Sequence, residues 1–309
     1  LTEHLGTGRH YNINSKSGRL HILYSDFANA EWSVYNNDLA AYEENMECIE
    51  AVKYPYVVIA PSYMIYTQNY DELLKTHIES GADITLLYHS VDNAKEYYLN
   101  CSTLNLNKQK GVLSLEPNHG NAKNRNIFMD TYVMRKDLFM ELVKKGRKIS
   151  SMFTLNDIVN MACSELDVRG MSHRGFFASI TDFKSYYNAN LSLIDMKNAV
   201  TLFDKNWPIY TRTNDSCPTK YYEGASVKSS VISNGCLIEG TVENSVIGRG
   251  CVIKKGAVVK DSVILPGVVI GEDAQIEAQV VDKSARIVHA KELIADPEKP
   301  GYVRRNDTL

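Results

Sequence analysis

The sequence predicts an α/β domain followed by a left-handed parallel β-helix. In the second part of the chain, short aliphatic segments form four rows that begin at Ser230, Ser245, Ser262 and Gln279, and these rows are 15, 17 and 17 residues apart. In the first part, apolar runs alternate with helix-like segments, which is the pattern of a sheet covered by helices. We therefore expect two domains with separate cores, for which 309 residues are sufficient.

Within these rows aliphatic residues recur every five or six residues, a period that neither an amphipathic helix nor a simple hairpin has. A three-sided coil has this period, because each side is one short strand, each corner is a turn, and one aliphatic side chain per side enters a shared core. We expect the β-helix at residues 223–290 and a charged tail at 291–309 that is loose or docked on a neighbour. The expected core residues are Ile247, Ile253, Val259, Ile264, Ile270, Ile276, Val281 and Ile287.

The α/β domain is expected at residues 1–205, and a polar linker at 206–222 joins it to the coils. Its clearest unit is a strand at 56–60, a helix that starts near Asn69 and ends at Gly81, and a second strand at 84–88. Further elements are expected as strands at 111–115, 127–134 and 176–180, and as helices at 135–145, from 156, and from 182 to about 204.

The apolar run at 56–60 lies between Pro55 and Pro61, which predicts a buried central parallel strand. Ligands of such sheets bind beyond the carboxyl ends of the strands. The loop at 61–68 is therefore the expected place for a site.

The composition argues against several classes of partner. The net charge is −3, so charge gives no reason to expect nucleic acid or an anionic membrane. No apolar run approaches the roughly 20 residues of a membrane span, and the start lacks the segments of a signal peptide. The six cysteines form no CxxC pair, which predicts reduced thiols in a cytoplasmic protein.

Four segments carry a family resemblance: His77–Thr85, Ser185–Leu191, Trp207–Thr211 and Ser262–Gly271. In this order they resemble parts of the ADP-glucose pyrophosphorylases (glucose-1-phosphate adenylyltransferases) of bacterial glycogen synthesis, and the resemblance covers nearly the whole chain. It implies that the first domain is a Rossmann-like, GT-A-like nucleotidyltransferase domain with a mixed sheet. The family's Gly-rich nucleotide loop would lie before Leu1, so we expect this domain to be truncated at its amino terminus.

The chain departs from the family at the metal site. The resemblance implies a Mg²⁺ ion held by two aspartates. Alignment on Tyr66 and its neighbours places the first aspartate at Tyr63, or at Ser62 with a slip of one residue, and alignment on Tyr187 places the second at Ser179. Hard cations need oxygen ligands such as carboxylates. We therefore expect no intact catalytic residue and no metal or other cofactor on this subunit.

The family's sugar-phosphate lysine, in Phe-Val-Glu-Lys-Pro, is also missing, because the chain reads Ser-Leu-Glu-Pro at Ser114–Pro117. Loss of this cation and both metal ligands removes most of the charge stabilisation that nucleotidyl transfer needs. We expect a vestigial substrate pocket that contains Ser62, Tyr63, Glu116 and Ser179.

This pattern resembles the regulatory, GlgD-type subunits of the family. The resemblance implies a heterotetramer with a catalytic, GlgC-type subunit that carries the Mg²⁺; self-association is the other assembly considered. A small phosphorylated effector or a nucleotide is a further candidate ligand, with Arg9, Arg249 and Lys254 as candidate effector-binding residues.

Two other functions remain open from the sequence. An active nucleotidyltransferase would have to recruit other carboxylates, such as Asp71, Glu116 or Asp182, whose simpler interpretations are helix caps and a surface charge. A hexapeptide acyltransferase would need a general base on the coils. The only histidine after the linker is His289, past the last complete side.

Overall fold

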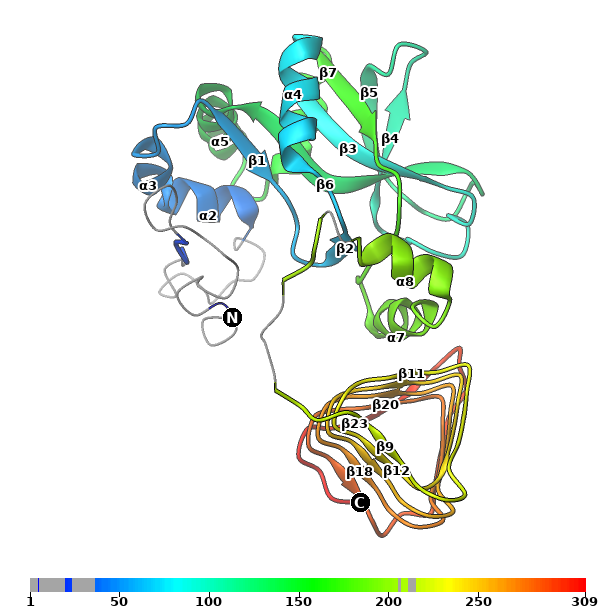
Figure 1. Ribbon diagram of the computed structural model, residues 1–309. Helices are drawn as coiled ribbons and strands as arrows, with labels where there is room; N and C mark the ends of the chain where they lie inside the picture. The colour runs from blue at the N-terminus through cyan, green and yellow to red at the C-terminus, as the bar shows by residue number, and fades with distance from the viewer. Residues whose placement is uncertain (1–4, 6–19, 24–36, 205–206, 211–214) are drawn as a thin grey trace. The chain divides into compact units, whose positions relative to one another are not determined.

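The computed structural model describes residue 5 and residues 20–23, 37–204, 207–210 and 215–309. The chain divides into two compact units, Leu1–Phe177 and Ala178–Leu309. The predicted fold class is confirmed, because the first unit holds a mixed sheet with helices and the second a three-sided parallel β-helix (Figure 1). The division falls before the expected boundary at residue 205, since Tyr187 packs against Val263 and Val280 of the coils.

A six-stranded mixed sheet organises the first unit, with strand order β5-β4-β6-β3-β7 and β1 paired to β6. Strand β6 is antiparallel to β1, β3 and β4, whereas β3 and β7 are parallel. The strands are β1 (Tyr56–Ile59), β3 (Ile84–Val91), β4 (Ser102–Leu106), β5 (Val112–Pro117), β6 (Arg125–Arg135) and β7 (Val168–Ser172), and the short strands β2 (Met64–Tyr66) and β8 (Phe177–Ser179) lie outside this sheet.

Helices cover both faces of the sheet because alternate side chains of the strands point to opposite sides. Leu86 lies in the cluster that α5 and α6 complete, while its neighbour Leu87 lies in the cluster that contains Leu73 of α4. The helices of this unit are α2 (Asp38–Glu44), α3 (Met46–Glu50), α4 (Tyr70–Ser80), α5 (Lys136–Ile149) and α6 (Leu155–Ala162).

The prediction of a buried central parallel strand at 56–60 was wrong. Strand β1 pairs with β6 in the antiparallel sense, and the side chain of Val58 is 39% exposed. An apolar run indicates a strand but does not define the direction of its neighbour. Val58 instead belongs to the large share of apolar surface that every folded protein leaves exposed.

The predicted helix from Asn69 to Gly81 is confirmed. The Asn69 side chain accepts hydrogen bonds from the backbone N–H groups of Asp71 and Glu72, and Gly81 closes the helix with φ 67°. A left-handed residue at this position is a common helix ending, and glycine adopts it without a Cβ penalty.

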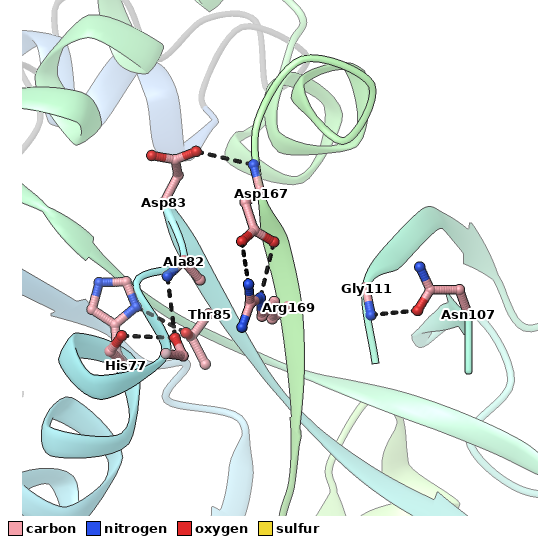
Figure 2. Close-up of polar contacts among 9 residues, drawn as sticks. His77, Ala82, Asp83, Thr85, Asn107, Gly111, Asp167 and Arg169 are labelled. Atoms are coloured by element: carbon pink, nitrogen blue, oxygen red, sulfur yellow. Dashed lines mark hydrogen bonds and ion pairs between the residues drawn. The ribbon is translucent and has the colours of Figure 1, made fainter. Parts of the chain in front are cut away.

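Figure 2 shows how this helix is joined to the amino end of β3, and how β3 is joined to β7. The buried His77 ring lies 2.8 Å from the Thr85 hydroxyl (Nδ1 to Oγ1), so α4 is tied to the first residues of β3. The Asp83 carboxylate accepts the backbone N–H of Asp167 at 3.0 Å, and Asp167 pairs with Arg169. Within His77–Thr85, which carries part of the family resemblance, these contacts are structural.

In the second unit, two helices precede the coils, α7 (Phe183–Ser192) and α8 (Met196–Leu202). The prediction of one continuous helix from 182 to about 204 was therefore wrong. Asp195 interrupts it, because its side chain accepts the backbone N–H of Lys197 and so starts a new helix.

The β-helix has three faces of five parallel strands each. The first face is β10 (Ser226–Lys228), β13 (Thr241–Glu243), β16 (Val258–Lys260), β19 (Gln275–Glu277) and β22 (Glu292–Ile294). The second is β11 (Val231–Ile232), β14 (Val246–Ile247), β17 (Val263–Ile264), β20 (Gln279–Val281) and β23 (Gly301–Val303). The third is β9 (Lys220–Tyr221), β12 (Leu237–Ile238), β15 (Val252–Ile253), β18 (Val269–Ile270) and β21 (Arg286–Ile287).

All eight predicted core residues are buried, with exposed fractions of 0 to 1%. Cys236 and Cys251 fill the same position in successive coils, and both are fully buried. The coils extend beyond the expected limits, because β9 already begins at Lys220 and the 291–309 segment contributes β22 and β23. The segment at 291–309, expected to be loose or docked on a neighbour, instead pairs its backbone with β19 and β20 of the same chain.

Buried serines at one corner bind successive coils together. The Ser245 hydroxyl accepts the backbone N–H of Ser262, and the Ser262 hydroxyl accepts that of Gln279, both at 3.1 Å. The residues that precede these serines and Gln279 take positive φ: Asn244 at 45°, Asp261 at 44° and Ala278 at 51°. A repeated left-handed turn therefore sets this corner.

Candidate functional site at the carboxyl ends of three strands

The carboxyl ends of β1, β3 and β7 lie at the same edge of the sheet. Strands β1 and β3 are both antiparallel to β6, and β7 is parallel to β3, so all three run in one direction. The loop from β1 to β2, where the sequence predicts a site, leaves β1 at this edge. Polar and aromatic side chains gather here from β2, β3, β6 and the segment after β7.

Tyr63, one of the predicted positions, donates a hydrogen bond from its hydroxyl to the Asp130 carboxylate. Asp130 lies on β6, two residues before Tyr132, which pairs with Ile59 at the carboxyl end of β1. The chain thus brings a carboxylate to this edge of the sheet. This carboxylate comes from β6, whereas the family resemblance places the metal-binding aspartates at Tyr63 or Ser62 and at Ser179. The Asp130 carboxylate already accepts a hydrogen bond from Tyr63.

The backbone of Asp130 is unusual for a residue inside a strand. The pairing of β3 with β6 shifts register, because Leu87 faces Thr131 whereas Tyr88 faces Phe128. Met129 and Asp130 therefore form a bulge, and Asp130 takes φ 42°. Bulges often lie near functional sites, where they redirect a side chain, and positive φ is rare for a residue with a Cβ.

Burial raises the pKa of the Asp130 carboxyl above its usual value, and the hydrogen bond from Tyr63 opposes part of this rise. The pKa of Tyr63 is also raised, first by burial and then by the negative charge of Asp130. At neutral pH the Tyr63 hydroxyl therefore keeps its proton and remains a donor to Asp130.

A second contact fixes the same part of the chain. The hydroxyls of Tyr66 and Thr131 lie 2.6 Å apart, and Tyr70 donates to the Tyr66 hydroxyl at 3.4 Å. Thr131, which is fully buried, also donates to the backbone carbonyl of Met129 at 2.9 Å. The β2 strand is thereby tied to the residue that follows Asp130.

Two histidines meet at the ends of β3 and β7. The Nδ1 atoms of His89 and His173 are 3.1 Å apart, and Nε2 of His173 lies 3.1 Å from the backbone carbonyl oxygen of Thr67. Because a carbonyl only accepts, His173 carries its proton on Nε2, and His89 donates from Nδ1. Burial and the neighbouring His173 lower the pKa of His89 to about 4, and burial also lowers the pKa of His173 from its ordinary 6.5, so the pair is neutral at pH 7.

The other predicted pocket residues lie on three different elements of the chain. Ser62 is exposed in the β1–β2 loop. Glu116 is exposed on β5, at the far end of the sheet, where its carboxylate lies 3.3 Å from the Ser114 hydroxyl. Ser179 is buried as the last residue of β8 and belongs to the second unit.

The carboxylates that an alternative active site would recruit serve local structure. Asp182 caps α7 by accepting the backbone N–H of Ser185 at 2.6 Å. Asp71 lies exposed in the first turn of α4, where its negative charge suits the helix dipole. His289 is exposed after β21, and its backbone N–H donates to the carbonyl of Leu309.

The candidate effector residues are separated. Arg249 and Lys254 lie in the turns at opposite ends of β15, so they occupy different corners of the coil. Lys254 pairs with Glu239 at 3.6 Å. Arg9 lies outside the described residues.

The residues at this edge do not suit the Mg²⁺ ion that the resemblance implies. The predicted positions Ser62, Tyr63 and Ser179 provide hydroxyls, and the one carboxylate present, Asp130, accepts from Tyr63 and has a raised pKa. Within the described part of the chain, no group of three or more His, Cys, Asp or Glu side chains could hold a metal ion. Among the described helices, none is long and apolar enough to cross a membrane.

Sequence reasoning missed Asp130, His89 and His173. Asp130 was detectable in principle, because it is the only charged residue in the apolar segment from Ile127 to Met134. A lone carboxylate within an otherwise buried strand usually needs a partner. The histidine pair gave no signal, since 84 residues separate its members and only the pairing of β3 with β7 brings them together.

Comparison with known proteins is consistent with this two-part architecture. A family described as "GlmU-like, C-terminal hexapeptide" matches residues 218–302, which coincide with the coils. Glucose-1-phosphate adenylyltransferase of Clostridioides difficile is 29% identical over 275 residues, which are 87% of this chain and 70% of that protein. The protein of the same name from Bacillus cereus is 26% identical over 308 residues, which are 97% of this chain and 79% of that protein. Over most of its length, the chain is thus similar to proteins named glucose-1-phosphate adenylyltransferase.

Proposed function

We propose that this chain is a non-catalytic, regulatory subunit of a glucose-1-phosphate adenylyltransferase of glycogen synthesis. Its relatives bear the name of that enzyme and match it over most of its length. One observation supports the non-catalytic role most directly. Tyr63 lies where the resemblance places a metal-binding aspartate, and its hydroxyl binds the nearby Asp130 carboxylate.

The chemistry of adenylyl transfer explains why this observation matters. The reaction needs a cation to offset the negative charge that develops on the transferred phosphoryl group. Ser and Tyr hydroxyls are poor substitutes for carboxylates around Mg²⁺. On this proposal the Mg²⁺ and the chemistry belong to a catalytic partner in a hetero-oligomer, which acts in the cytoplasm, and this chain changes the partner's activity or its response to effectors.

A second candidate function is an active adenylyltransferase in its own right. Asp130 favours it, because a carboxylate is present at the carboxyl end of β1. The contact with Tyr63 and the raised pKa of Asp130 both disfavour metal binding, however. We therefore place this candidate second.

The proposal is tested by reconstitution. The full-length protein is co-expressed with the catalytic adenylyltransferase of its source organism, and ADP-glucose formation is compared with that of the catalytic protein alone. We expect co-purification and a change in the rate or in effector response. If the two proteins do not associate and the partner's kinetics are unchanged, the regulatory assignment is wrong.

A further inference from the structure

The segment from the β1–β2 loop to Thr67 is fastened to the sheet at three points within the first unit. Tyr63 donates to Asp130 just before β2, the Tyr66 and Thr131 hydroxyls meet in β2, and the carbonyl of Thr67 lies against His173 after β2. This segment crosses the edge where the carboxyl ends of β1, β3 and β7 meet. Ligands of α/β sheets bind at such an edge.

The first of these three points differs from the other two. Tyr66 and His173 contact partners inside the cluster, and His173 is only 5% exposed. Tyr63 is 37% exposed, although its hydroxyl contacts Asp130. A contact at the rim of a structure can open without disrupting the core beneath it.

Asp130 also pays a local conformational cost to make this contact. Its φ of 42° lies in the left-handed region, within a bulge between regular stretches of β3 and β6. Strained residues of this kind persist where the surrounding structure holds them, and they concentrate at ligand sites and switch regions. The strain turns the backbone of β6 at the position that Tyr63 contacts.

We infer that Tyr63 and Asp130 form a latch that holds the β1–β2 loop closed over the carboxyl end of β1, and that a sugar nucleotide enters only when this latch opens. The inference rests on the proposed function for the class of ligand. It goes beyond that function because it assigns the closed state of the site to two residues of this chain. The latch also gives Asp130 a role other than metal binding.

The expected effect follows from the strength of the contact. A hydrogen bond to a charged group, once removed, shifts the equilibrium between closed and open loops by about 10- to 100-fold. If only the open form binds ligand, the apparent affinity rises by the same factor. Releasing the latch should therefore increase binding, which ordinary damage to a binding site would not do.

The test is calorimetric titration of ADP-glucose into the full-length protein and two latch variants. Tyr63→Phe removes the hydroxyl and keeps the ring, and Asp130→Asn removes the charge and keeps the shape. Tyr97→Phe and Asp92→Asn make the same chemical changes at exposed positions of the first unit. Hydrogen exchange of the peptide that covers residues 60–68 reports whether the loop opens.

Tyr63→Phe should bind ADP-glucose about tenfold or more tightly than the unmodified protein, with faster exchange in residues 60–68. Asp130→Asn should show a smaller increase, because its amide oxygen can still accept a weaker, neutral hydrogen bond from Tyr63. Both controls should match the unmodified protein. Equal or weaker binding by both latch variants overturns the inference, whether or not the loop exchanges faster. A variant that fails to fold is recognised by exchange throughout the first unit, and the other variant then decides. The regulatory assignment is judged by turnover and partner association, so each idea can fail separately.

Discussion

The Tyr187 hydroxyl, on α7, donates a hydrogen bond to the backbone carbonyl oxygen of Asp261, at the corner of the β-helix where the chain takes positive φ. The ring of Tyr187 is 1% exposed and packs against Val263 and Val280. Lys184 pairs with Glu298, and Phe183 meets Tyr302 edge to face at 5.6 Å between ring centroids. Helix α7 is thus part of the β-helix unit.

Replacing Tyr187 tests this docking. Tyr187→Phe keeps the ring but leaves the Asp261 carbonyl without this donor, so we expect the unfolding free energy to fall by about 1 to 2 kcal/mol. Tyr187→Ala also removes the buried ring and should cost about 3 to 5 kcal/mol. Urea unfolding followed by tryptophan fluorescence and circular dichroism measures both. Tyr210→Phe, at a 51% exposed ring, should change little; if Tyr187→Phe behaves like it, the hydrogen bond does not stabilise the unit.

The buried serine ladder makes a second prediction. Ser262→Ala removes the acceptor of the Gln279 backbone N–H, and a buried donor left unpaired costs about 1 to 3 kcal/mol. Ser230→Ala removes the equivalent acceptor of the Ser245 backbone N–H at the outermost coil, where water can replace it, so its cost should be smaller. Equal losses of unfolding free energy for the two variants would show that burial does not determine the contribution of the ladder.

The close packing of successive coils leads to a third prediction. A Cβ at Gly240 would lie 2.4 Å from the carbonyl oxygen of Ala257, whereas a Cβ at Gly250 would meet no atom within 4 Å. Gly250→Ala meets only the strain of φ 67° and should cost about 1 kcal/mol. Gly240 has no positive φ, but Gly240→Ala must push two coils apart and should cost more than Gly250→Ala, about 3 kcal/mol. Thermal unfolding ranks the two, and the reverse order would contradict the packing.

The histidine pair predicts a pH dependence in the first unit. Burial depresses the pKa of His89 to about 4 and lowers that of His173, from an ordinary value of 6.5. As the pH falls from about 6.5 towards 4, the unfolded chain therefore binds more protons than the folded one. The free energy of unfolding decreases over this range, and the contribution of His89 to the decrease is up to about 3 kcal/mol. Above about pH 6.5 the contribution of the histidine pair to the free energy of unfolding is complete.

His89→Asn isolates this effect, because an amide can donate to His173 but does not titrate. Its unfolding free energy should decline less steeply than that of the unmodified protein between pH 6.5 and 4. Parallel curves would show that protonation of His89 does not destabilise the fold.

The sequence predicted the β-helix more closely than the α/β domain, for a physical reason. Ile253 and Ile270 contact residues in adjacent coils only 17 residues away, so a local period reports the core directly. The pairing of β1 with β6 depends on contacts such as Val57 with Met134, which no local period encodes. Tyr63, with Ser62 as the alternative, was singled out only through the family resemblance, and its contact with Asp130, 67 residues away, also leaves no local signal in the sequence.

We propose that this chain lacks catalysis of its own. The most direct measurement is ADP-glucose formation by the purified full-length protein alone, with ATP, glucose 1-phosphate and Mg²⁺. Loss of even one stabilising group usually lowers turnover by about 100- to 1,000-fold, so we predict a rate at least about 1,000-fold below that of a catalytic relative assayed in parallel. Turnover within tenfold of that relative would contradict the claim.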